Sequence, residues 1–417
     1  MDMHSRNEYL KELQQRYFHT RSKKEKSSIL DEYCRNTHQN RKYVIRKIRS
    51  FRFSAPRRRK KRKQIYDGYV RAALAKVWEI FDYPCGQRLA PLLKTEVARL
   101  RQLEEIFIPS EVAEKLKTIS PATIDRKLKH QREVLHLKRS RAKPKPSSLL
   151  YRKIPIRLTE WDTSKVGFLE IDLVNHCGSS TQGLYVCSLN TVEISSGWWE
   201  AEAVMGKGQD PTFEALKKIR ERAPFPWCGI DSDNDAPFIN HHLIEYSEKE
   251  HLEFTRSRPN RKNDNAYIEQ KNWTHVRKTV GYLRYDTDKE LAIMNSLYEN
   301  ELRLYKNFFS PVMKLKRKIR IGSKVKRQYG IPKTPYQRLI ESGQISETAK
   351  RELKILYQIL NPADLKRTID RKTHELYKAY EEKRKGGEAT PSKKQTPRTV
   401  TSFMIQRSRS GLPHNMI

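Results

Sequence analysis

The chain carries two acidic motifs inside apolar runs, FLEIDLVNHCG at residues 168–178 and GIDSDNDAPFIN at residues 229–240. In the first motif apolar and acidic residues alternate, which predicts a β-strand with Glu170 and Asp172 on one face. A carboxylate on a buried strand is poorly solvated unless something compensates its charge, and a metal ion is one such compensator. Asp172 is therefore a candidate metal ligand, whereas we expect a structural role for Glu170.

The segments around these motifs predict a mixed α/β sheet. YVCSL (residues 185–189) and WWEAEAV (residues 198–204) are short β-rich runs, and residues 211–222 have a helical pattern. The apolar run FPWCGID (residues 225–231) then leads into the second acidic motif. Strand, strand, strand, helix and strand is an order that begins a mixed sheet with helices packed against it.

The second motif offers three candidate ligands, because Asp231, Asp233 and Asp235 alternate after an apolar run. A third acid, Glu269, lies in NDNAYIEQKNWTHVRKTVGYL (residues 263–283), which predicts a helix that begins near the first residue of this string. Glu269 borders the inward face of that helix, where an unpaired acid lowers stability. The inward face is an apolar stripe at helical spacing, formed by Trp273, Val276, Val280 and Leu283.

A set of three carboxylates suits in-line attack on a phosphodiester. A pair of divalent ions, roughly 3.5–4 Å apart, can activate the nucleophile and stabilise the leaving oxygen. Mg²⁺ prefers carboxylate oxygens as ligands, and this chemistry requires no protein nucleophile. Composition and spacing alone therefore indicate a metal-dependent nucleic-acid enzyme.

The spacing of the acids is more specific. Residues 234–268 between Asp233 and Glu269 number 35, whereas Asp231 would leave 37 and Asp235 would leave 33, so Asp233 is preferred. This interval matches the Asp-Asp-x35-Glu pattern of retroviral integrases and related insertion-sequence transposases. The strings FLEIDLVNHCG, GIDSDN, FINHH, TRSRP and KNDNAYIEQKNW also resemble the integrase-core transposases of bacterial insertion sequences. The first 150 residues and TPYQRL, which begins at Thr334, resemble that group more weakly.

The resemblance implies a ribonuclease H-like fold, with Asp172 on the first strand, Asp233 just after the fourth strand and Glu269 on a following helix. It implies that these three residues are catalytic and hold a pair of Mg²⁺ or Mn²⁺ ions. The implied substrate is double-stranded DNA, namely the inverted-repeat ends of an element and a target site. The implied reaction is 3′-end cleavage followed by strand transfer, performed by a homo-oligomer on paired ends.

The sequence departs from the family pattern at Asp235, where a glycine is usual, and at Pro237, where an acid is common. Asp tolerates a left-handed backbone better than most residues, so the turn can survive, but an extra carboxylate beside the metal ions could weaken catalysis. One alternative hypothesis is therefore a catalytically impaired, transposase-derived DNA-binding regulator. Another is a structure-specific nuclease on the same fold, which cuts DNA without joining it.

The charge of the chain is large and unevenly distributed. With 85 Lys and Arg residues against 49 Asp and Glu, the formal net charge is +36, which indicates a polyanionic partner. Residues 166–280 hold 17 acids and 13 bases, a net charge of −4, so the flanks carry +36 − (−4) = +40. No run approaches the ~18 apolar residues of a membrane helix. We therefore expect no membrane partner and a location in the bacterial cytoplasm, associated with the nucleoid.

Basic helices in the flanks are candidate DNA-binding elements. Residues 23–50 predict a helix, a turn and a second helix with one basic face, which suits the major groove. A second helical unit has Ser120 as an N-cap and Pro121 at the first helical position. In both units a solvated surface on a small packed bundle is the alternative. The candidate DNA-contacting residues are Arg41, Lys42, Arg46, Arg126 and Lys127, and Lys271 and Lys278 on the helix of Glu269.

We therefore expect a multidomain protein with N-terminal all-α helix-turn-helix units, a central α/β core and a basic C-terminal region. The C-terminal region holds helices and a candidate small β unit in KLKRKIRIGSKVKR (residues 314–327). The expected domains are an N-terminal helix-turn-helix (1–55), a basic linker (56–68), a second helical DNA-binding unit (69–141), a linker (142–165), the ribonuclease H-like core (166–290), a DNA-binding and assembly region (291–385) and a disordered tail (386–417).

Overall fold

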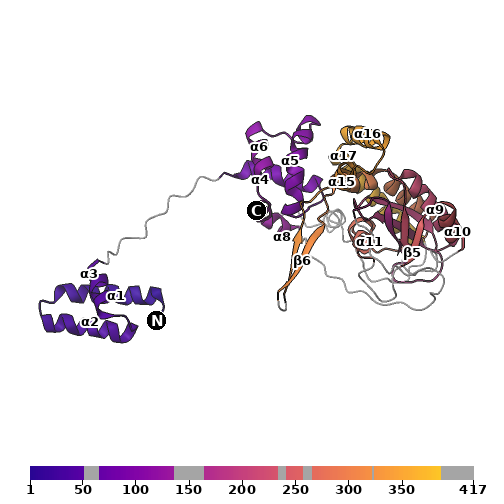
Figure 1. Ribbon diagram of the computed structural model, residues 1–417. Coiled ribbons are helices and arrows are strands. Elements are labelled where there is room, and N and C mark those ends of the chain that lie inside the picture. The colour runs from indigo at the N-terminus through magenta and orange to yellow at the C-terminus, as the bar shows by residue number, and fades with distance from the viewer. Residues whose placement is uncertain (51–64, 136–163, 233–240, 257–264, 322–323, 387–417) are drawn as a thin grey trace. The chain divides into compact units, whose positions relative to one another are not determined.

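The computed structural model describes residues 1–50, 65–135, 164–232, 241–256, 265–321 and 324–386 (Figure 1). The chain forms two compact units, Met1–Ile65 and Tyr66–Ile417. Most of the two expected linkers, and the expected tail apart from its first residue, lie outside the described residues. The second helical segment, the sheet and the C-terminal helices all belong to the second unit.

Within residues 1–50, the described part of the first unit, α1 (Met3–His19), α2 (Lys23–Thr37) and α3 (Arg41–Ser50) form a three-helix bundle. The expected turn between the last two helices is confirmed, and His38 ends α2 in the left-handed conformation. Helix α1 was not among the predicted elements. Its apolar side completes a small core with the other two helices, made of Leu10, Leu13, Tyr17, Ile29, Leu30, Tyr33, Val44 and Ile48.

The second unit begins with five helices. The predicted N-cap is confirmed, since the Ser120 side chain accepts a hydrogen bond from the backbone N–H of Thr123 and Pro121 starts the helix. Ile124 and Leu128 are both fully buried and face inward. The helices are α4 (Gly68–Ile80), α5 (Gly86–Gln102), α6 (Ser110–Thr118), α7 (Pro121–Lys127) and α8 (Lys129–Val134).

A mixed sheet forms the centre of the second unit, and its five strands among the described residues have the order β3-β2-β1-β4-β5. β1 pairs with β2 and β2 with β3 in antiparallel fashion, whereas β4 is parallel to both β1 and β5. The predicted strands and the helix between β3 and β4 are confirmed. The elements are β1 (Phe168–Asn175), β2 (Val186–Glu193), β3 (Trp199–Met205), α9 (Gln209–Arg222), β4 (Gly229–Ser232), α10 (His241–Lys249) and β5 (Glu253–Arg256).

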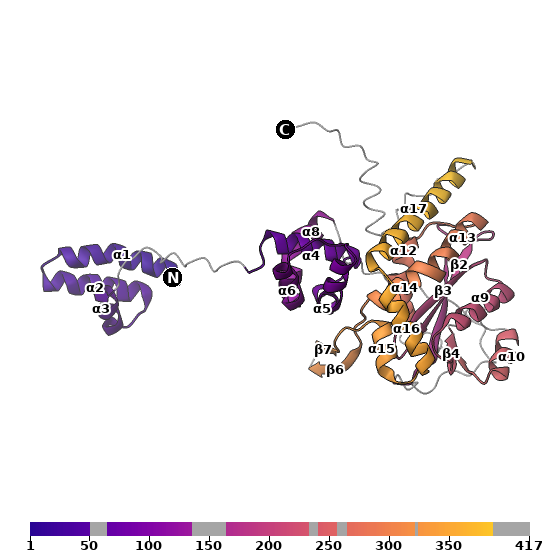
Figure 2. The same ribbon diagram turned by 90° about the horizontal axis from the view of Figure 1, so that it is seen from above.

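Helices cover both faces of this sheet, and Figure 2 shows α9 and α10 on one side with α12 (Lys278–Val280) and α14 (Arg303–Phe309) on the other. Because side chains alternate along a strand, neighbouring residues of β3 contact helices on opposite faces of the sheet. Glu202 of β3 accepts a hydrogen bond from Arg222 of α9, whereas the ring of Trp199, an odd position of the same strand, packs against His275. The second of these faces is the one that carries Asp172.

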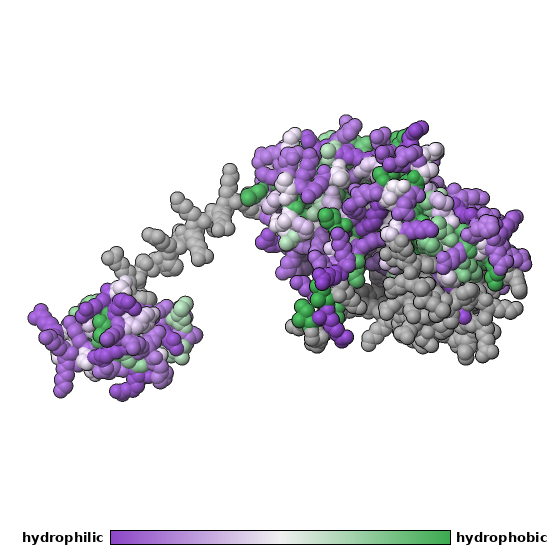
Figure 3. Space-filling model, viewed as in Figure 1, coloured by the Kyte–Doolittle hydropathy of each residue, from purple (hydrophilic) through white to green (hydrophobic). Residues whose placement is uncertain are grey.

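The C-terminal part is helical and includes one β-hairpin, so a small β unit is present where the sequence indicated it. The hairpin exposes basic and apolar side chains together, and Figure 3 shows hydrophobic and hydrophilic patches side by side at its position. No described helix is both long and apolar enough to span a membrane. The elements are α13 (Asp288–Ser296), η2 (Leu297–Leu302), α14, β6 (Leu315–Ile321), β7 (Lys324–Tyr329), α15 (Pro335–Ser342), α16 (Glu347–Ile359) and α17 (Pro362–Gly386).

Candidate active site

Asp172 lies in β1 directly opposite Asn190 of β2, and its side chain is half-buried. One carboxylate oxygen, Oδ1, accepts a hydrogen bond of 2.7 Å from the backbone N–H of Leu173. The other, Oδ2, accepts one from the side-chain amide of Asn272. Both oxygens are therefore held in a defined orientation at the sheet face.

A chain of buried polar side chains supports this orientation. Asn190 donates a hydrogen bond from its amide to Oδ1 of Asn272, and its own Oδ1 accepts one from the indole N–H of Trp199. Asn190 is fully buried. It was not among the predicted site residues, although an asparagine inside the β-rich run VCSLNTVE was a signal, because a buried amide needs a partner.

Glu269 lies in the first turn of α11 (Ala266–Lys271), and its side chain is exposed. The helix is attached to β1 on both sides of this residue. The backbone N–H of Ile268 donates a hydrogen bond of 2.9 Å to Oε2 of the buried Glu170, and Asn272 donates to Asp172. Glu170 therefore has the structural role expected of it, since it satisfies a helix N-terminal N–H group.

The helix of Glu269 differs from the single α-helix that the sequence predicted. It changes to a π-helix, η1 (Asn272–Arg277), before α12 restores α-helical geometry. The apolar stripe is largely buried as expected, but Trp273 is only half-buried. The π-helix begins at the residue that contacts Asp172, and π-helical turns occur frequently at functional sites.

Of the three aspartates in the second motif, the structure describes only Asp231. This residue is fully buried, and its Oδ1 accepts a hydrogen bond of 2.6 Å from the hydroxyl of Thr255. It pairs in register with Glu170, on β1. Asp233 and Asp235 lie outside the described residues. Strand β4 ends at Ser232, which pairs with Ile171, the residue before Asp172.

No three potential metal-ligating side chains cluster within the part of the chain that the structure describes, a part that does not include Asp233. The donor type nevertheless fits a hard cation. Asp172 and Glu269 are carboxylates, the ligands that Mg²⁺ and Mn²⁺ prefer. They lie on β1 and on a helix attached to β1, and neither side chain is fully buried.

The candidate DNA-contacting residues of the first unit differ in accessibility. Lys42 and Arg46 are exposed on α3, as expected. Arg41 is not a freely available cation, because its guanidinium pairs with Asp31 of α2 and also donates to the hydroxyl of Ser27. Its position at the first residue of α3 lets it reach back to the preceding helix.

In the second unit, Arg126 is exposed, while Lys127 donates a hydrogen bond of 2.5 Å to the carbonyl oxygen of Tyr66. Lys278 pairs with Asp82 in the turn after α4. Lys271 was expected on a DNA-facing surface, but its side chain is only 3% exposed. The turn after α4 explains the outcome for Lys271 and Lys278, because it faces the side of the helix that carries both lysines across a shared cavity, and its Asp82 pairs with Lys278.

Burial strongly perturbs the groups on this covered face. Nζ of Lys271 lies 3.2 Å from Nε2 of His275. Burial lowers the pKa of Lys271 to about 7, and nearby cations, of which Arg88 has the largest effect, act in the same direction. Burial and the charge of Lys271 also lower the pKa of His275 well below its ordinary value, so this imidazole is neutral.

The uncharacterized protein y4rM of Sinorhizobium fredii is 35% identical to the chain over 339 residues, which cover 81% of this chain and 96% of that protein. This chain belongs to the y4rM family. Because y4rM itself is uncharacterized, membership of the y4rM family does not assign an activity. No protein-family model matches the chain.

Solved structures similar to this y4rM-family chain include retroviral integrase catalytic cores. The HTLV-2 integrase core in complex with magnesium, in its dimeric form, has a TM-score of 0.27 and 14% identity, and the match covers 35% of this chain and 89% of that chain. The catalytic core of BIV integrase has a TM-score of 0.27 and 15% identity, with 42% and 95% covered.

Proposed function

We propose that the chain is a DNA transposase that uses Asp172, Asp233 and Glu269 to cleave DNA at element ends and join those ends to target DNA. The observation that carries the proposal is the double attachment of α11 to β1. Ile268 bonds to Glu170 and Asn272 bonds to Asp172, so Glu269 lies between two helix positions that both contact the strand of Asp172. Residues three apart on a helix are neighbours, with Cβ atoms about 5–6 Å apart.

The strand register supports the inclusion of Asp233. β4 runs parallel to β1 and ends at Ser232, which pairs with Ile171. The next residue of β1 after that pair is Asp172. Consecutive Cα atoms are about 3.8 Å apart, which bounds how far Asp233 can lie from Ser232. Asp231 is the weaker candidate, because it is fully buried and bonded to Thr255.

In this proposal Asp172, Asp233 and Glu269 hold Mg²⁺ or Mn²⁺. Bound divalent ions would supply activation of an attacking water or hydroxyl and stabilisation of the leaving oxygen. The chain's own contribution is to position the ligands. Asn272 and Asn190 orient the Asp172 carboxylate, and Glu170 sets the start of α11 against β1.

The charge distribution supports double-stranded DNA as the substrate. Exposed cations occur on α3, at Lys42 and Arg46, and on the hairpin, at Arg317, Arg320 and Lys326. A two-stranded β-ribbon fits the major groove of DNA, and its cations can also contact phosphates. We further propose, from the resemblance to insertion-sequence transposases, that the protein acts as a homo-oligomer on paired element ends.

A strand-transfer assay tests this function. Labelled duplexes that carry the terminal repeats flanking the gene are incubated with the full chain, a target plasmid and Mg²⁺. Joined products support the proposal. Nicked DNA without joined products would instead identify a nuclease, and binding without any product would identify a DNA-binding regulator.

Variants of the ligands complete the test. Asp172→Asn, Asp233→Asn and Glu269→Gln should each abolish product formation while DNA binding persists. Glu214→Gln is the matched control, because Glu214 is on the surface of α9 and pairs only with Lys217 three residues away. Normal turnover by the Asp172 or Glu269 variant would rule out the assigned triad.

A further inference from the structure

A cavity of about 260 Å³ lies beside the Glu269 helix, on the side that faces α5 and the turn after α4. Its walls come from three segments: the turn after α4 with the start of α5, the η1 region, and the end of α14 with the residues that follow it. Neither Asp172 nor Glu269 lines it. Residues 270, 271, 274, 275 and 278 line the cavity, whereas Asn272, which contacts Asp172, does not.

The cavity is rich in cations. Arg88 from α5, Lys271 from α11, Lys278 from α12 and Lys306 from α14 all line it, and Asp82 is the only acid among the described residues that do so. Asp82 is already paired with Lys278. Within the described ranges, no ion pair reaches the other three cations.

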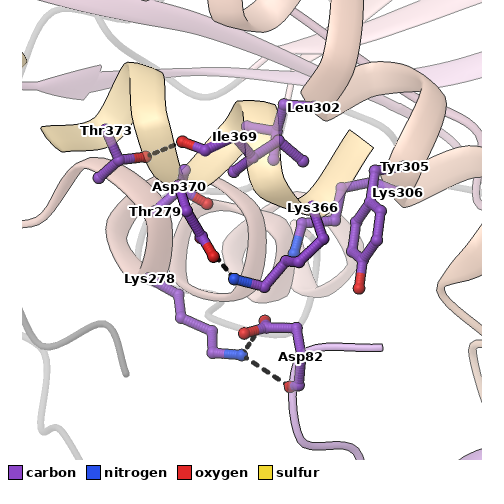
Figure 4. A pocket seen from close by; sticks show the side chains of 10 residues that line it. All are labelled: Asp82, Lys278, Thr279, Leu302, Tyr305, Lys306, Lys366, Ile369, Asp370 and Thr373. Atoms are coloured by element: carbon purple, nitrogen blue, oxygen red, sulfur yellow. Dashed lines mark hydrogen bonds and ion pairs between the residues drawn. The ribbon is translucent and has the colours of Figure 1, made fainter. Parts of the chain in front are cut away.

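Two of these cations are buried. Lys306 is 7% exposed and Lys271 is 3% exposed, and Nε of Arg88 is buried with no hydrogen-bond partner in the described structure. A second cavity of about 30 Å³ shares Asp82, Lys278 and Lys306. In Figure 4, which shows this smaller cavity, Lys278 points at Asp82 and is joined to it, while no hydrogen bond or ion pair joins Lys306 to the other residues drawn.

Buried unpaired cations oppose folding unless an anion compensates them. Burial lowers the pKa of Lys306 to about 8, and the nearby Asp82 offsets only part of this effect. Most of the Lys306 side chains therefore remain charged at neutral pH. Arg88 and Lys306 thus bring two cations without an ion pair to one space, and the Lys271 amine, which contacts His275, adds a nitrogen donor from a third helix.

We propose that this cavity is a phosphate-binding site, in which Arg88, Lys271 and Lys306 bind one phosphate group. A phosphate group offers several acceptor oxygens in different directions, which suits donors that approach from separate helices. The group could come from a small free phosphate ester or from a phosphodiester of bound DNA. The DNA source rests on the proposed function, whereas the free-phosphate source does not.

Thermal unfolding of the full chain tests the site. Inorganic phosphate, compared with sodium chloride of equal ionic strength, should raise the Tm by a few degrees and reach saturation, because a ligand that binds only the folded state stabilises it. Lys306→Met should remove this response. Lys350→Met is the matched control, because Lys350 lies on α16 outside the lining of the cavity, and its partly exposed side chain pairs with Glu347.

A second readout makes the test independent of the response to phosphate. In chloride alone, Lys306→Met should raise the Tm, because it removes an uncompensated buried charge and keeps the length of the side chain. An equal phosphate response in the wild type, Lys306→Met and Lys350→Met would overturn the proposal. So would the lack of a phosphate response in the wild type.

DNA binding then distinguishes the two sources. If a DNA phosphodiester occupies the cavity, Lys306→Met weakens duplex binding several-fold and inorganic phosphate competes with DNA in the wild type only. If a free phosphate ester is the ligand, duplex affinity is unchanged by Lys306→Met and the phosphate response persists when DNA is bound. Failure of strand transfer with an intact phosphate response would reject the proposed function and leave the phosphate site supported.

Discussion

The side-chain amide of Asn272 donates a hydrogen bond to Oδ2 of Asp172, which joins residues 100 positions apart in the chain. Asn272 is also the first residue of the π-helical turn η1, and its Oδ1 accepts a hydrogen bond from Asn190. The candidate ligand on β1 is therefore oriented by a helix and by the neighbouring strand at once. This arrangement makes Asn272 a positioning residue for Asp172.

We predict that Asn272→Ala lowers strand transfer by about 10–100-fold, the effect typical of residues that orient metal ligands. The Mg²⁺ concentration for half-maximal activity should rise in parallel, which a purely structural loss would not cause. Titration of Mg²⁺ in the strand-transfer assay measures both effects. Asn300→Ala is the control, because Asn300 is exposed and donates only to the carbonyl of Ser296. An unchanged Mg²⁺ dependence would contradict the positioning role.

Glu170 should contribute to stability. Glu170→Ala removes the acceptor of the buried Ile268 N–H group, which should destabilise the fold by about 1–3 kcal/mol. Glu170→Gln keeps an acceptor oxygen, so its loss should be smaller. Urea unfolding measures both variants, and equal destabilisation by the two would show that this hydrogen bond is not the cause.

Asp82 should make stability depend on pH in acid. Burial raises the pKa of this carboxyl, but the charges of Lys278, Lys306 and Lys366 outweigh burial and leave it below the ordinary value of 3.8. The stabilisation from ionised Asp82 is therefore complete above pH 3.8. It is lost as the pH falls through the pKa that Asp82 has in the folded state, which lies below 3.8. Asp82→Asn should be less stable near pH 6, and the difference from wild type should shrink in acid. Chemical unfolding at a series of pH values checks this, and a constant difference would contradict it.

Lys306 should act in the opposite pH range. Its pKa in the folded state is about 8 against an ordinary 10.5, so the unfolded chain binds more protons between these values and stability rises with pH. The charged groups that act on it are Asp82, Lys278, Lys366 and Arg88. Lys306→Met should be the more stable protein near pH 7 by on the order of 1–3 kcal/mol, and this gain should diminish between pH 8 and 10. Urea unfolding of both proteins over this range measures it, and a gain that grows with pH would refute the assignment.

The hairpin should contribute to DNA affinity through phosphates. Replacing Arg320 and Lys326 together by glutamine should weaken duplex binding about equally for unrelated sequences. It should also reduce the slope of log affinity against log salt by about 1 for each phosphate that the hairpin no longer neutralises. Fluorescence anisotropy from about 50 to 200 mM salt gives the slope. An unchanged slope would exclude the hairpin from the DNA interface.

Local patterns in the sequence determined where β1 to β4 and several of the helices lie. Alternation with period two located β1, and a serine followed by a proline located the start of α7, because both signals depend on neighbours in the chain. Strand alternation also directed attention to Asp172, and the spacing of the acids to Asp233 and Glu269. These predictions needed no knowledge of how distant segments pack.

Only the tertiary structure decided which polar groups meet. Lysine is usually a surface residue, yet Lys271 is buried behind the turn after α4. Arg41 is paired with Asp31 of the preceding helix. The contacts of Asp172 with Asn272, and of Asn272 with Asn190, join three separate elements. Burial and hydrogen bonding of this kind depend on long-range packing, which the periodicity of a single segment does not encode.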